Sequence, residues 1–324
     1  MVMSYNDKRL KLISEEILEP ERPIIDAHHH LWKTRQKEGR YVLEDLWDDT
    51  ESGHNIRKTV FVECCSSYGE DGPDHLKSVG ETNFVAALAR NSEKDPDKAT
   101  IAAIIGYANL IEIDDLKEVL DAHQAVGHGL FRGIRGMPRN KRHRDFPYWH
   151  DDYRAGVKAL GDLGLTNDTW HPFDHNRDFL AFAKAVPRTT IILNHFGGLL
   201  GGLVRSSKDD VYDEWRKDMA EVAECPNVVA KLGGMAMPNN PFGWYERDTL
   251  ATSDEYVSEL QDYYLYMIEC FGPDRCMFES NFPVDKHSIS YHVLWNAFKK
   301  IVTGFSEDEK QSIFYKTAAR VYRV

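Results

Sequence analysis

The amino-acid sequence predicts a single-domain (β/α)8 barrel, also called a TIM barrel, in which eight parallel strands alternate with helices. Short apolar or β-branched runs alternate with longer amphipathic stretches, and there are eight such runs. No repeat or low-complexity linker divides the 324 residues, of which 42% are hydrophobic, so one sizeable core is expected. An open doubly wound α/β sheet is the alternative. It is disfavoured because no glycine-rich phosphate loop follows the first run.

The expected strands come in chain order, and each centres on apolar or β-branched residues. They lie at residues 23–30, 57–64, 100–107, 130–136, 165–171, 190–195, 227–232 and 275–281. The helices expected between them open with Asp and carry an apolar stripe, at residues 114–126, 174–186, 209–224 and 254–271. We expect residues 23–324 to form the barrel and residues 1–22 to form an N-terminal extension. The segments 31–56 and 233–252 are longer than plain connections, so we expect them to lie over the barrel mouth.

Charge and composition exclude several classes of protein. The chain has 40 Lys+Arg against 52 Asp+Glu, a net charge of −12, which argues against nucleic acid or an anionic membrane as partner. No apolar run approaches the roughly 20 residues of a membrane span. The first 21 residues lack the apolar middle of a signal peptide, and the five cysteines lack a paired zinc-type spacing. We therefore expect a cytoplasmic enzyme with a small-molecule substrate. Homo-oligomerisation is left open.

A cluster of histidines ends the first expected strand, in the run Asp26-Ala27-His28-His29-His30. Side chains alternate along a strand, so His28 and His30 share one face and His29 points to the other. Two imidazoles about 7 Å apart along a strand can both reach one divalent ion, such as Zn or Mn. The alternative is that the histidines only hydrogen-bond to loops, which a His-X-His pair at this position disfavours.

Three later strand ends also carry polar side chains, at the end of the barrel where active sites lie. His171 closes the fifth strand and His195 the sixth, and both are predicted metal ligands, His195 also with a catalytic role. His175 lies four residues after His171 and could take its place. Arg135, at the end of the fourth strand, is predicted to bind a substrate carboxylate with its guanidinium fork. A salt bridge across the barrel rim is the alternative for this arginine.

Five motifs follow one another in a fixed order. They are IDAHHHLW at 25–32, GIRG at 133–136, ILNHFGG at 192–198, AKLGG at 230–234 and RCMFESNFPV at 275–284. Together they resemble the amidohydrolase-related (amidohydrolase 2) barrel family, which includes sugar-acid lactonases and 2-pyrone-4,6-dicarboxylate lactonase. The resemblance covers roughly residues 23–323 and implies hydrolysis in the barrel mouth. It matches His28 and His30 to a ligand pair, His195 to the sixth-strand histidine, and Arg135 to an arginine that faces anionic substrates. The resemblance also implies that some members use a divalent ion and others none, and we expect one ion here.

The eighth strand departs from the family pattern. Relatives typically read Gly-Ser-Asp-Trp-Pro there, with the Asp as general base or metal ligand, whereas this chain reads ESNFP at residues 279–283. An amide cannot take a proton from water at neutral pH, so Asn281 is expected only to coordinate or orient a ligand. Glu279, on the same face of the strand, is the first candidate base, and Asp285 is the second. The alternative is that Glu279 pairs with Lys231 or Arg135.

These residues predict a hydrolase that opens a lactone or related cyclic ester of an anionic small molecule. In that reaction His28, His30 and His195 polarise the carbonyl group, directly or through a metal, and a carboxylate activates water. A lyase is the alternative, a decarboxylase or hydratase acting on an aromatic or unsaturated carboxylic acid, because related barrels use the same set of residues. A third interpretation is a barrel that has lost catalysis and only binds a ligand, which Asn281 would mark.

Overall fold

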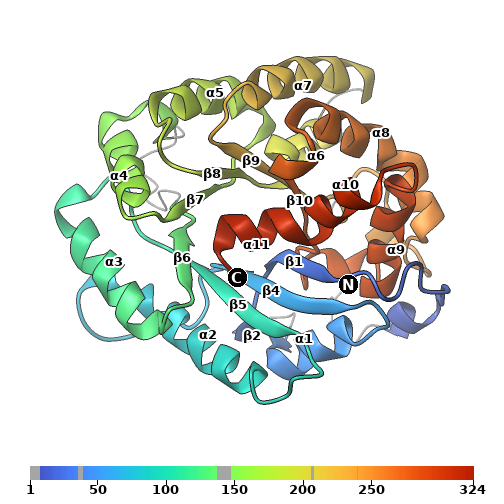
Figure 1. The fold of residues 1–324 in the computed structure, drawn as a ribbon, viewed down its shortest axis with the longest axis horizontal. Coiled ribbons are helices and arrows are strands. Elements are labelled where there is room, and N and C mark those ends of the chain that lie inside the picture. Colours follow the sequence, from blue (N-terminus) through green and yellow to red (C-terminus); the bar gives the residue numbers. More distant parts are fainter. Residues whose placement is uncertain (1–7, 36–38, 137–146, 206–207, 239) are drawn as a thin grey trace.

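Eight parallel strands form a barrel in the computed structural model, which describes residues 8–35, 39–136, 147–205, 208–238 and 240–324 (Figure 1). The strands follow the chain order around the sheet, and each pairs in parallel with the next. They are β1 (Ile24–His29), β4 (Ile56–Val62), β5 (Thr100–Gly106), β6 (Phe131–Ile134), β7 (Thr166–Thr169), β8 (Ile191–Leu193), β9 (Val228–Leu232) and β10 (Cys276–Phe278). Each matches one expected run, so the predicted (β/α)8 barrel is confirmed.

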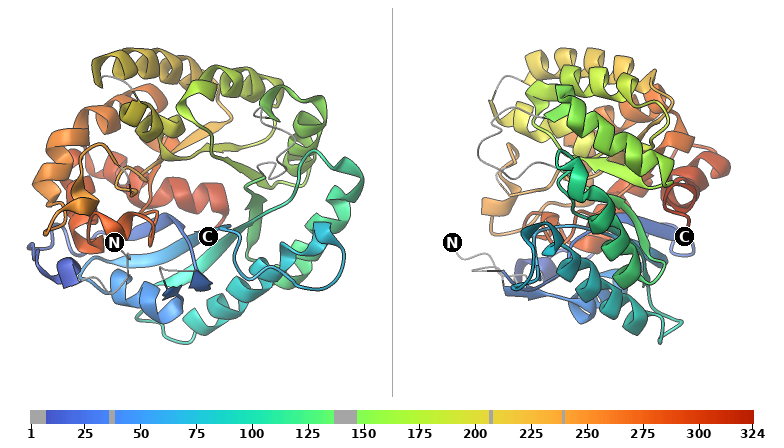
Figure 2. Two further views of the ribbon diagram at one scale, coloured as in Figure 1. Left: turned by 180° about the vertical axis from the view of Figure 1, so that it is seen from behind. Right: turned by 90° about the vertical axis from the view of Figure 1, so that its left-hand side faces the viewer.

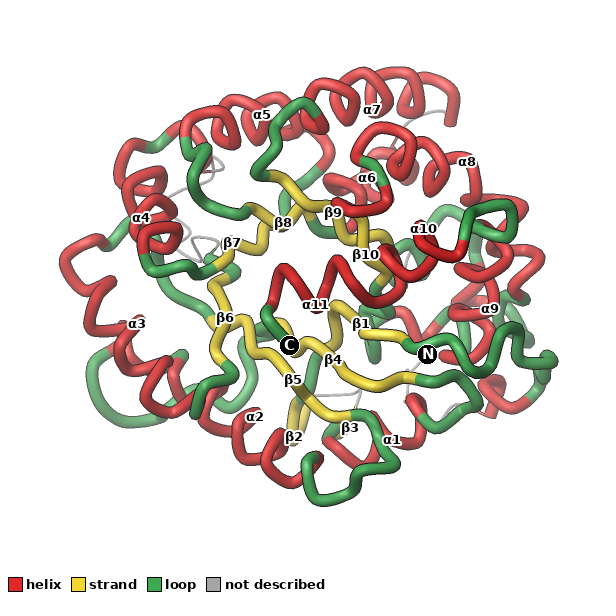
Figure 3. The backbone as a smooth tube through the Cα atoms, in the orientation of Figure 1, coloured by secondary structure: helices red, strands yellow, loops and turns green. Residues whose placement is uncertain are grey.

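The helices lie outside the ring of strands, apart from the C-terminal helix, which crosses one end of it (Figure 3). They are α1 (Leu43–Thr50), α2 (Val79–Ser92), α3 (Ile113–Gly127), α4 (Asp151–Asp162), α5 (Asn176–Ala185), α6 (His195–Arg205), α7 (Lys208–Ala223), α8 (Ser253–Phe271), α9 (Tyr291–Ile301), α10 (Glu307–Gln311) and α11 (Thr317–Tyr322). The predicted helices correspond to α3, α5, α7 and α8. Helix α8 begins with a capping box, in which the Glu255 amide donates to Thr252 Oγ1 and the Thr252 amide donates to the Glu255 carboxylate. None of the helices in the described ranges has the length and hydrophobicity that crossing a membrane requires.

The segments before and after the first barrel strand have different structures. Within residues 8–22, the part around Leu18 contacts α9: the Leu18 amide donates to Asn296 Oδ1 (3.0 Å) and Lys299 Nζ donates to the Leu18 carbonyl (2.7 Å). The boundary at residue 22 stays a prediction, and residues 1–7 fall outside the described part of the chain. After β1, the strands β2 (Trp32–Arg35) and β3 (Gly39–Tyr41) form an antiparallel hairpin, and the Trp32 ring stacks on His30.

The C-terminal helix closes one end of the barrel. Helix α11 crosses the ring of strands in Figure 1, and the left view of Figure 2 shows the molecule from the opposite side. Ala318, Val321 and Tyr322 of this helix belong to the same buried cluster as Ile25 and Met277 on the barrel strands. Since the Arg132 side chain at the start of β6 also donates to the Tyr322 carbonyl, α11 lies at the amino-terminal end of the strands. A functional site is therefore expected at the other end.

A β-bulge in β1 turns two histidines towards the barrel interior. Asp26 pairs with Thr59 of β4 and His29 with Phe61, so three steps along β1 correspond to two steps along β4. Before the bulge, Ile25 and Ala27 are part of the interior cluster. After it, His28 and His30 contact each other, while the His29 ring packs on Phe61 with 6.0 Å between ring centroids. The bulge thus exchanges the two faces of the strand just before the strand ends.

The barrel ring closes where β1 meets the residues that follow β10. The His30 amide donates to the Phe282 carbonyl (2.8 Å), and the Asn281 amide donates to the His28 carbonyl (2.9 Å). These bonds continue the sheet past the end of β10, and a parallel bridge also pairs His29 with Phe282. The closure therefore uses the first-strand histidine motif and the eighth-strand motif together, and it places them side by side.

A buried ion pair lies inside the barrel between α11 and the histidines. Lys231 Nζ of β9 lies 2.7 Å from Asp168 Oδ2 of β7, and neither side chain is exposed. The hydroxyl group of Tyr322 donates to the same carboxylate oxygen at 3.1 Å. The partner of Lys231 is therefore Asp168 and not Glu279, which leaves Glu279 available to the histidines.

Replacing Lys231 should destabilise the barrel strongly, because the Asp168 carboxylate would then be buried without its cation. We expect Lys231→Met to lower the free energy of unfolding by about 3–5 kcal/mol in urea denaturation. The control is Lys117→Met, since Lys117 pairs with Asp121 on the surface and both side chains are mostly exposed. That variant should lose less than about 1 kcal/mol. Equal losses in the two variants would contradict the assigned role of the buried pair.

Candidate active site

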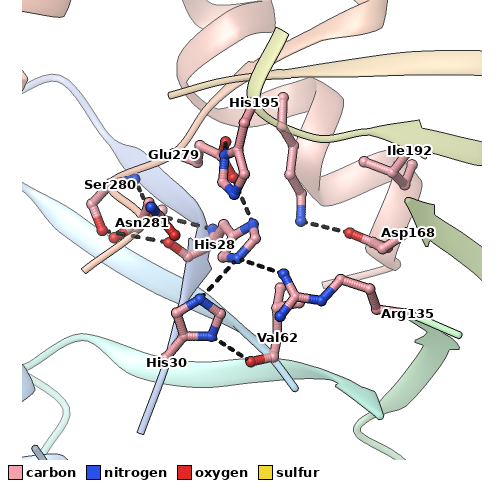
Figure 4. Close-up of polar contacts among 12 residues, drawn as sticks. His28, His30, Val62, Arg135, Asp168, Ile192, His195, Glu279, Ser280 and Asn281 are labelled. Carbon is pink, nitrogen blue, oxygen red and sulfur yellow. Dashed lines mark hydrogen bonds and ion pairs between the residues drawn. The ribbon is translucent and has the colours of Figure 1, made fainter. Parts of the chain in front are cut away.

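Three imidazoles and one carboxylate meet at the carboxyl ends of three barrel strands (Figure 4). His28 and His30 come from the end of β1, His195 lies two residues after β8, and Glu279 directly follows β10. All four side chains are buried, with at most 5% of their surface exposed. The first, sixth and eighth strands thus contribute to one cluster, at the end of the barrel opposite α11.

The Glu279 carboxylate binds two of the imidazoles at once. Oε1 lies 2.7 Å from His195 Nδ1, and Oε2 lies 2.7 Å from His28 Nδ1. Only the contact with His195 has hydrogen-bond geometry, and because a carboxylate accepts, His195 Nδ1 carries the proton and its Nε2 carries the lone pair. The contact with His28 is a short ion-pair distance in which the two atoms are not aligned for a hydrogen bond. Glu279 therefore fixes the tautomer of His195, as carboxylates commonly do for metal-binding imidazoles.

His30 has the same tautomer for a different reason. Its Nδ1 lies 2.7 Å from the Val62 carbonyl oxygen, which can only accept, so the proton is on Nδ1 and Nε2 is free. The Nε2 atoms of His28 and His30 face each other at 3.3 Å. Burial lowers the pKa of both imidazoles well below the ordinary value, aided by the charge of Lys231 for His28 and of Arg135 for His30. Two uncharged rings therefore direct their Nε2 atoms at each other.

This donor set fits a divalent metal ion. Two ligands bound at 2.0–2.1 Å to a tetrahedral zinc ion lie about 3.3 Å apart, which is the separation of the two Nε2 atoms. Imidazole binds metals in its neutral form, the form that burial favours here. His28, His195 and Glu279 also present ligand atoms that all lie within 4.8 Å of one another. The expectation of one divalent ion is thus compatible with the residues present.

Arg135 lies beside the cluster and is already paired. Its Nε donates to Glu63 Oε1 at 2.9 Å, and a terminal nitrogen donates to the Glu63 carbonyl. The other terminal nitrogen, Nη1, lies 3.5 Å from His28 Nε2. The salt bridge across the barrel rim is therefore present, and one end of the guanidinium still faces the imidazoles.

The structure does not bring His171 to the cluster. Its Nδ1 bonds to the Tyr148 hydroxyl (2.8 Å), its Nε2 bonds to Asn176 Oδ1 (2.9 Å), and its ring stacks on Phe179. Both ring nitrogens are thus engaged away from the other histidines, which argues against the metal-ligand role expected of it. His175, the expected competitor, pairs instead with Asp178.

Asp285 and Asn281 hold the loops around the cluster. Asn281 Nδ2 donates to Asp285 Oδ1 (2.7 Å), and the Ala236 amide donates to Asp285 Oδ2 (2.8 Å). Burial raises the pKa of the Asp285 carboxyl group to about 8. With both oxygens engaged inside the protein, Asp285 joins the loop after β9 to the loop after β10, and the geometry favours a positioning role for it.

The glycine pair of the AKLGG motif makes room for two site residues, Gly233 for Glu279 and Gly234 for His195. Gly234 has a φ of +72°, and a Cβ atom there would lie 2.2 Å from His195 Nδ1. A side chain at this position would displace the imidazole from Glu279, and the backbone conformation itself favours glycine. The motif after β9 is thus explained by the close approach of backbone and imidazole.

A cavity of about 320 Å³ opens beside His195. It lies at the ends of β7 and β8 and is bounded by the loop after β9. Its walls are Trp170, His171, Pro172, His195, Gly198, Leu200, Gly201, Val204, Met237 and Pro238. Met237 and Pro238 belong to the segment 233–252, which was expected to lie over the mouth. The cavity gives a small molecule access to the edge of the imidazole cluster.

Sequence reasoning missed several partners of the site residues. The Val62 carbonyl that orients His30 is a backbone atom and gives no sequence signal. Glu63 lies within the expected second strand, at 57–64, but nothing in the sequence marks it as the partner of Arg135. Asp168 could have been found, because a lysine on a buried strand such as β9 requires a buried carboxylate, which here comes from β7 on the far side of β8. Asp168 is the carboxylate within the expected fifth strand.

The sequence of this chain matches a known protein family over most of its length. A family model described as amidohydrolase matches residues 25–324. The chain therefore belongs to the amidohydrolase family, which confirms the family and the hydrolase class predicted from the five motifs.

Particular relatives span nearly the same length. An uncharacterized protein of Sinorhizobium fredii, y4mH, is 32% identical over 93% of this chain and 98% of its own. An L-fucono-1,5-lactonase of Burkholderia ambifaria is 26% identical over 81% of each chain. Among solved structures, an amidohydrolase from Burkholderia multivorans with bound zinc superposes with a TM-score of 0.74 at 21% identity, covering 93% of this chain and 99% of that one. This structural likeness supports the barrel fold.

Removing one of the paired imidazoles should weaken metal binding. We expect His30→Ala to lower zinc affinity at least tenfold, because one of the two converging Nε2 atoms is lost. Zinc content after dialysis, measured by plasma mass spectrometry, and calorimetric titration report the change. His29→Leu is the matched control, since His29 is the neighbouring buried imidazole and faces Phe61. Equal zinc binding by His30→Ala and the unaltered protein would contradict the assignment.

Proposed function

We propose that this protein hydrolyses a lactone, the cyclic ester of a small hydroxy acid, at the carboxyl end of its barrel. The observation that carries the proposal is the cluster of three buried imidazoles, with the Nε2 atoms of His28 and His30 3.3 Å apart and His195 lining the adjacent cavity. The named relatives support the choice of reaction, because two of them are L-fucono-1,5-lactonases, at 26% and 24% identity. The proposal concerns ring opening and not the sugar of those relatives.

In this proposal His28 and His30 hold a divalent ion through their Nε2 atoms. When bound, the ion would supply a Lewis acid that polarises the ester carbonyl. Arg135 Nη1, on the same side of His28, donates a hydrogen bond to an oxygen atom of the substrate. An anionic group on the substrate would bind to this guanidinium, whose charge is already balanced by Glu63. Binding of a substrate carboxylate to Arg135 is part of the proposal.

His195 serves as the general base. Its Nε2 is unprotonated and its ring lines the cavity, so it can take a proton from a water molecule that attacks the carbonyl carbon. The resulting imidazolium is stabilised by Glu279 on Nδ1, 2.7 Å away. The ring carbon–oxygen bond then breaks, and the leaving oxygen receives the proton from His195. Water has been added across the ester bond, and the product is a hydroxy acid.

Glu279 has a positioning role in this scheme in place of the base role expected from its place in the strand. Both of its oxygens face Nδ1 atoms at 2.7 Å, so neither is directed at a water molecule. Its charge keeps His195 in the tautomer that can accept a proton. Asp285 also has both oxygens engaged, which supports the choice of His195.

Product analysis of a panel of lactones tests the proposed reaction. We expect the protein to convert at least one lactone to the open hydroxy acid, identified by liquid chromatography with mass detection, at a rate that falls after chelation. Release of carbon dioxide from an aromatic acid, or hydration of a double bond without ester cleavage, would indicate the lyase alternative and overturn the proposal. Binding of lactones without turnover would indicate a barrel that only binds its ligand.

Replacing His195 should abolish turnover while leaving the metal in place. We expect His195→Ala to lower kcat about 10²–10⁴-fold, because the proton acceptor is lost. Zinc content should stay unchanged, since His28 and His30 keep their Nε2 atoms. His175→Ala is the control, as this histidine is partly exposed and pairs with Asp178 outside the cluster. A parallel loss of zinc and activity in His195→Ala would show instead that His195 is a ligand.

A further inference from the structure

We propose that the substrate carries an apolar group, an alkyl chain or aromatic ring, which binds in the cavity beside His195. This inference rests on the proposed lactone hydrolysis and names the class of lactone. We call the site the apolar cleft and define it by Trp170, Leu200, Val204, Met237 and Pro238, all of which line the cavity. Its volume of about 320 Å³ is at the lower end of the roughly 300–1,000 Å³ of small-molecule pockets.

The apolar cleft meets the proposed reacting centre at His195. His195 lines the same cavity and begins α6, the helix that also carries Leu200 and Val204. Trp170 follows β7, and Met237 and Pro238 lie in the loop after β9, so three neighbouring connections enclose the space. A group attached to the lactone ring would therefore enter the cleft while the ester lies at the imidazoles.

Two large apolar side chains of the cleft remain in contact with water. Trp170 is 44% exposed and Val204 is 55% exposed, although both belong to a concave site. Exposed apolar surface of this kind is typical of a site that a ligand covers, because covering it removes the surface from water. A ligand with apolar carbon atoms gains most from this contact.

The cleft has few groups that could bind hydroxyl groups. Among the residues that line it, His171 has both ring nitrogens bonded to Tyr148 and Asn176, and His195 is needed for the water molecule. None of the side chains that the structure assigns to this cavity carries a permanent charge. A ring bearing several hydroxyl groups would lose its hydrogen bonds to water and find few replacements. The geometry therefore favours an alkyl- or aryl-substituted lactone over a sugar lactone.

A matched set of six-membered lactones tests the inference with the metal-loaded protein. The set is δ-valerolactone, its pentyl-substituted form δ-decalactone, a phenyl-substituted form, and D-glucono-1,5-lactone. We expect the pentyl or phenyl group to raise kcat/KM at least tenfold over δ-valerolactone, and glucono-lactone to be the poorest substrate. Preference for glucono-lactone would overturn this inference and leave lactone hydrolysis intact. Failure to open any lactone in this set or the wider panel would overturn the proposed function itself.

Two variants test whether the apolar cleft determines substrate preference without taking part in the reaction. Val204→Asp places a charge in the apolar cleft, and we expect it to lower the ratio of kcat/KM for δ-decalactone over δ-valerolactone about tenfold. Trp170→Ala should lower the same ratio without adding a charge. Leu163→Asp is the matched control, because Leu163 is also 55% exposed but ends α4, before β7 begins. Circular dichroism and thermal melting confirm folding. An unchanged ratio in both cleft variants would overturn the inference.

Discussion

The Glu279 carboxylate is the interaction on which the arrangement of the site depends. It joins His28 from the first barrel strand to His195 from the sixth, and it lies itself at the end of the eighth. Because it accepts from His195 Nδ1 and lies 2.7 Å from His28 Nδ1, it sets the tautomer of His195 and holds the two rings beside each other. The requirement extends to the backbone, where Gly234 has no side chain and so allows His195 to approach the carboxylate. The position of one carboxylate thus depends on four segments that are distant in sequence, those of His28, His195, Gly234 and Glu279.

The barrel interior contains two layers of buried charged groups, one near α11 and one near the mouth. Near α11, Lys231 and Asp168 neutralise each other and bond to Tyr322, so this layer is closed and complete. Towards the mouth, Arg135 is balanced by Glu63 and Glu279 by histidine N–H groups. The first layer contributes to stability, whereas the second presents imidazole nitrogens beside a cavity that a small molecule can enter. That difference explains why chemistry is expected at only one end of the barrel.

The sequence was informative where the signal is local. Strand and helix positions follow from hydrophobic periodicity, and the His-X-His spacing places His28 and His30 on one face because strand geometry fixes it. The partners were harder to predict, because they depend on contacts between distant segments. Nothing near His171 indicates that Tyr148 and Asn176 engage both of its nitrogens. The bulge in β1 was equally hidden, since one extra residue in a strand leaves no mark on composition.

Closure of the barrel has a consequence for how the protein acquires its activity. The last hydrogen bonds of the ring join His28 and His30 to Asn281 and Phe282, residues separated by most of the chain. The imidazoles and their carboxylate therefore come together only when the final strand docks against the first. During synthesis, a ribosome-bound chain that has not yet released its eighth strand contains the histidines but no assembled centre. Reactivity towards esters is thus withheld from nascent and truncated chains and arises with the completed ring.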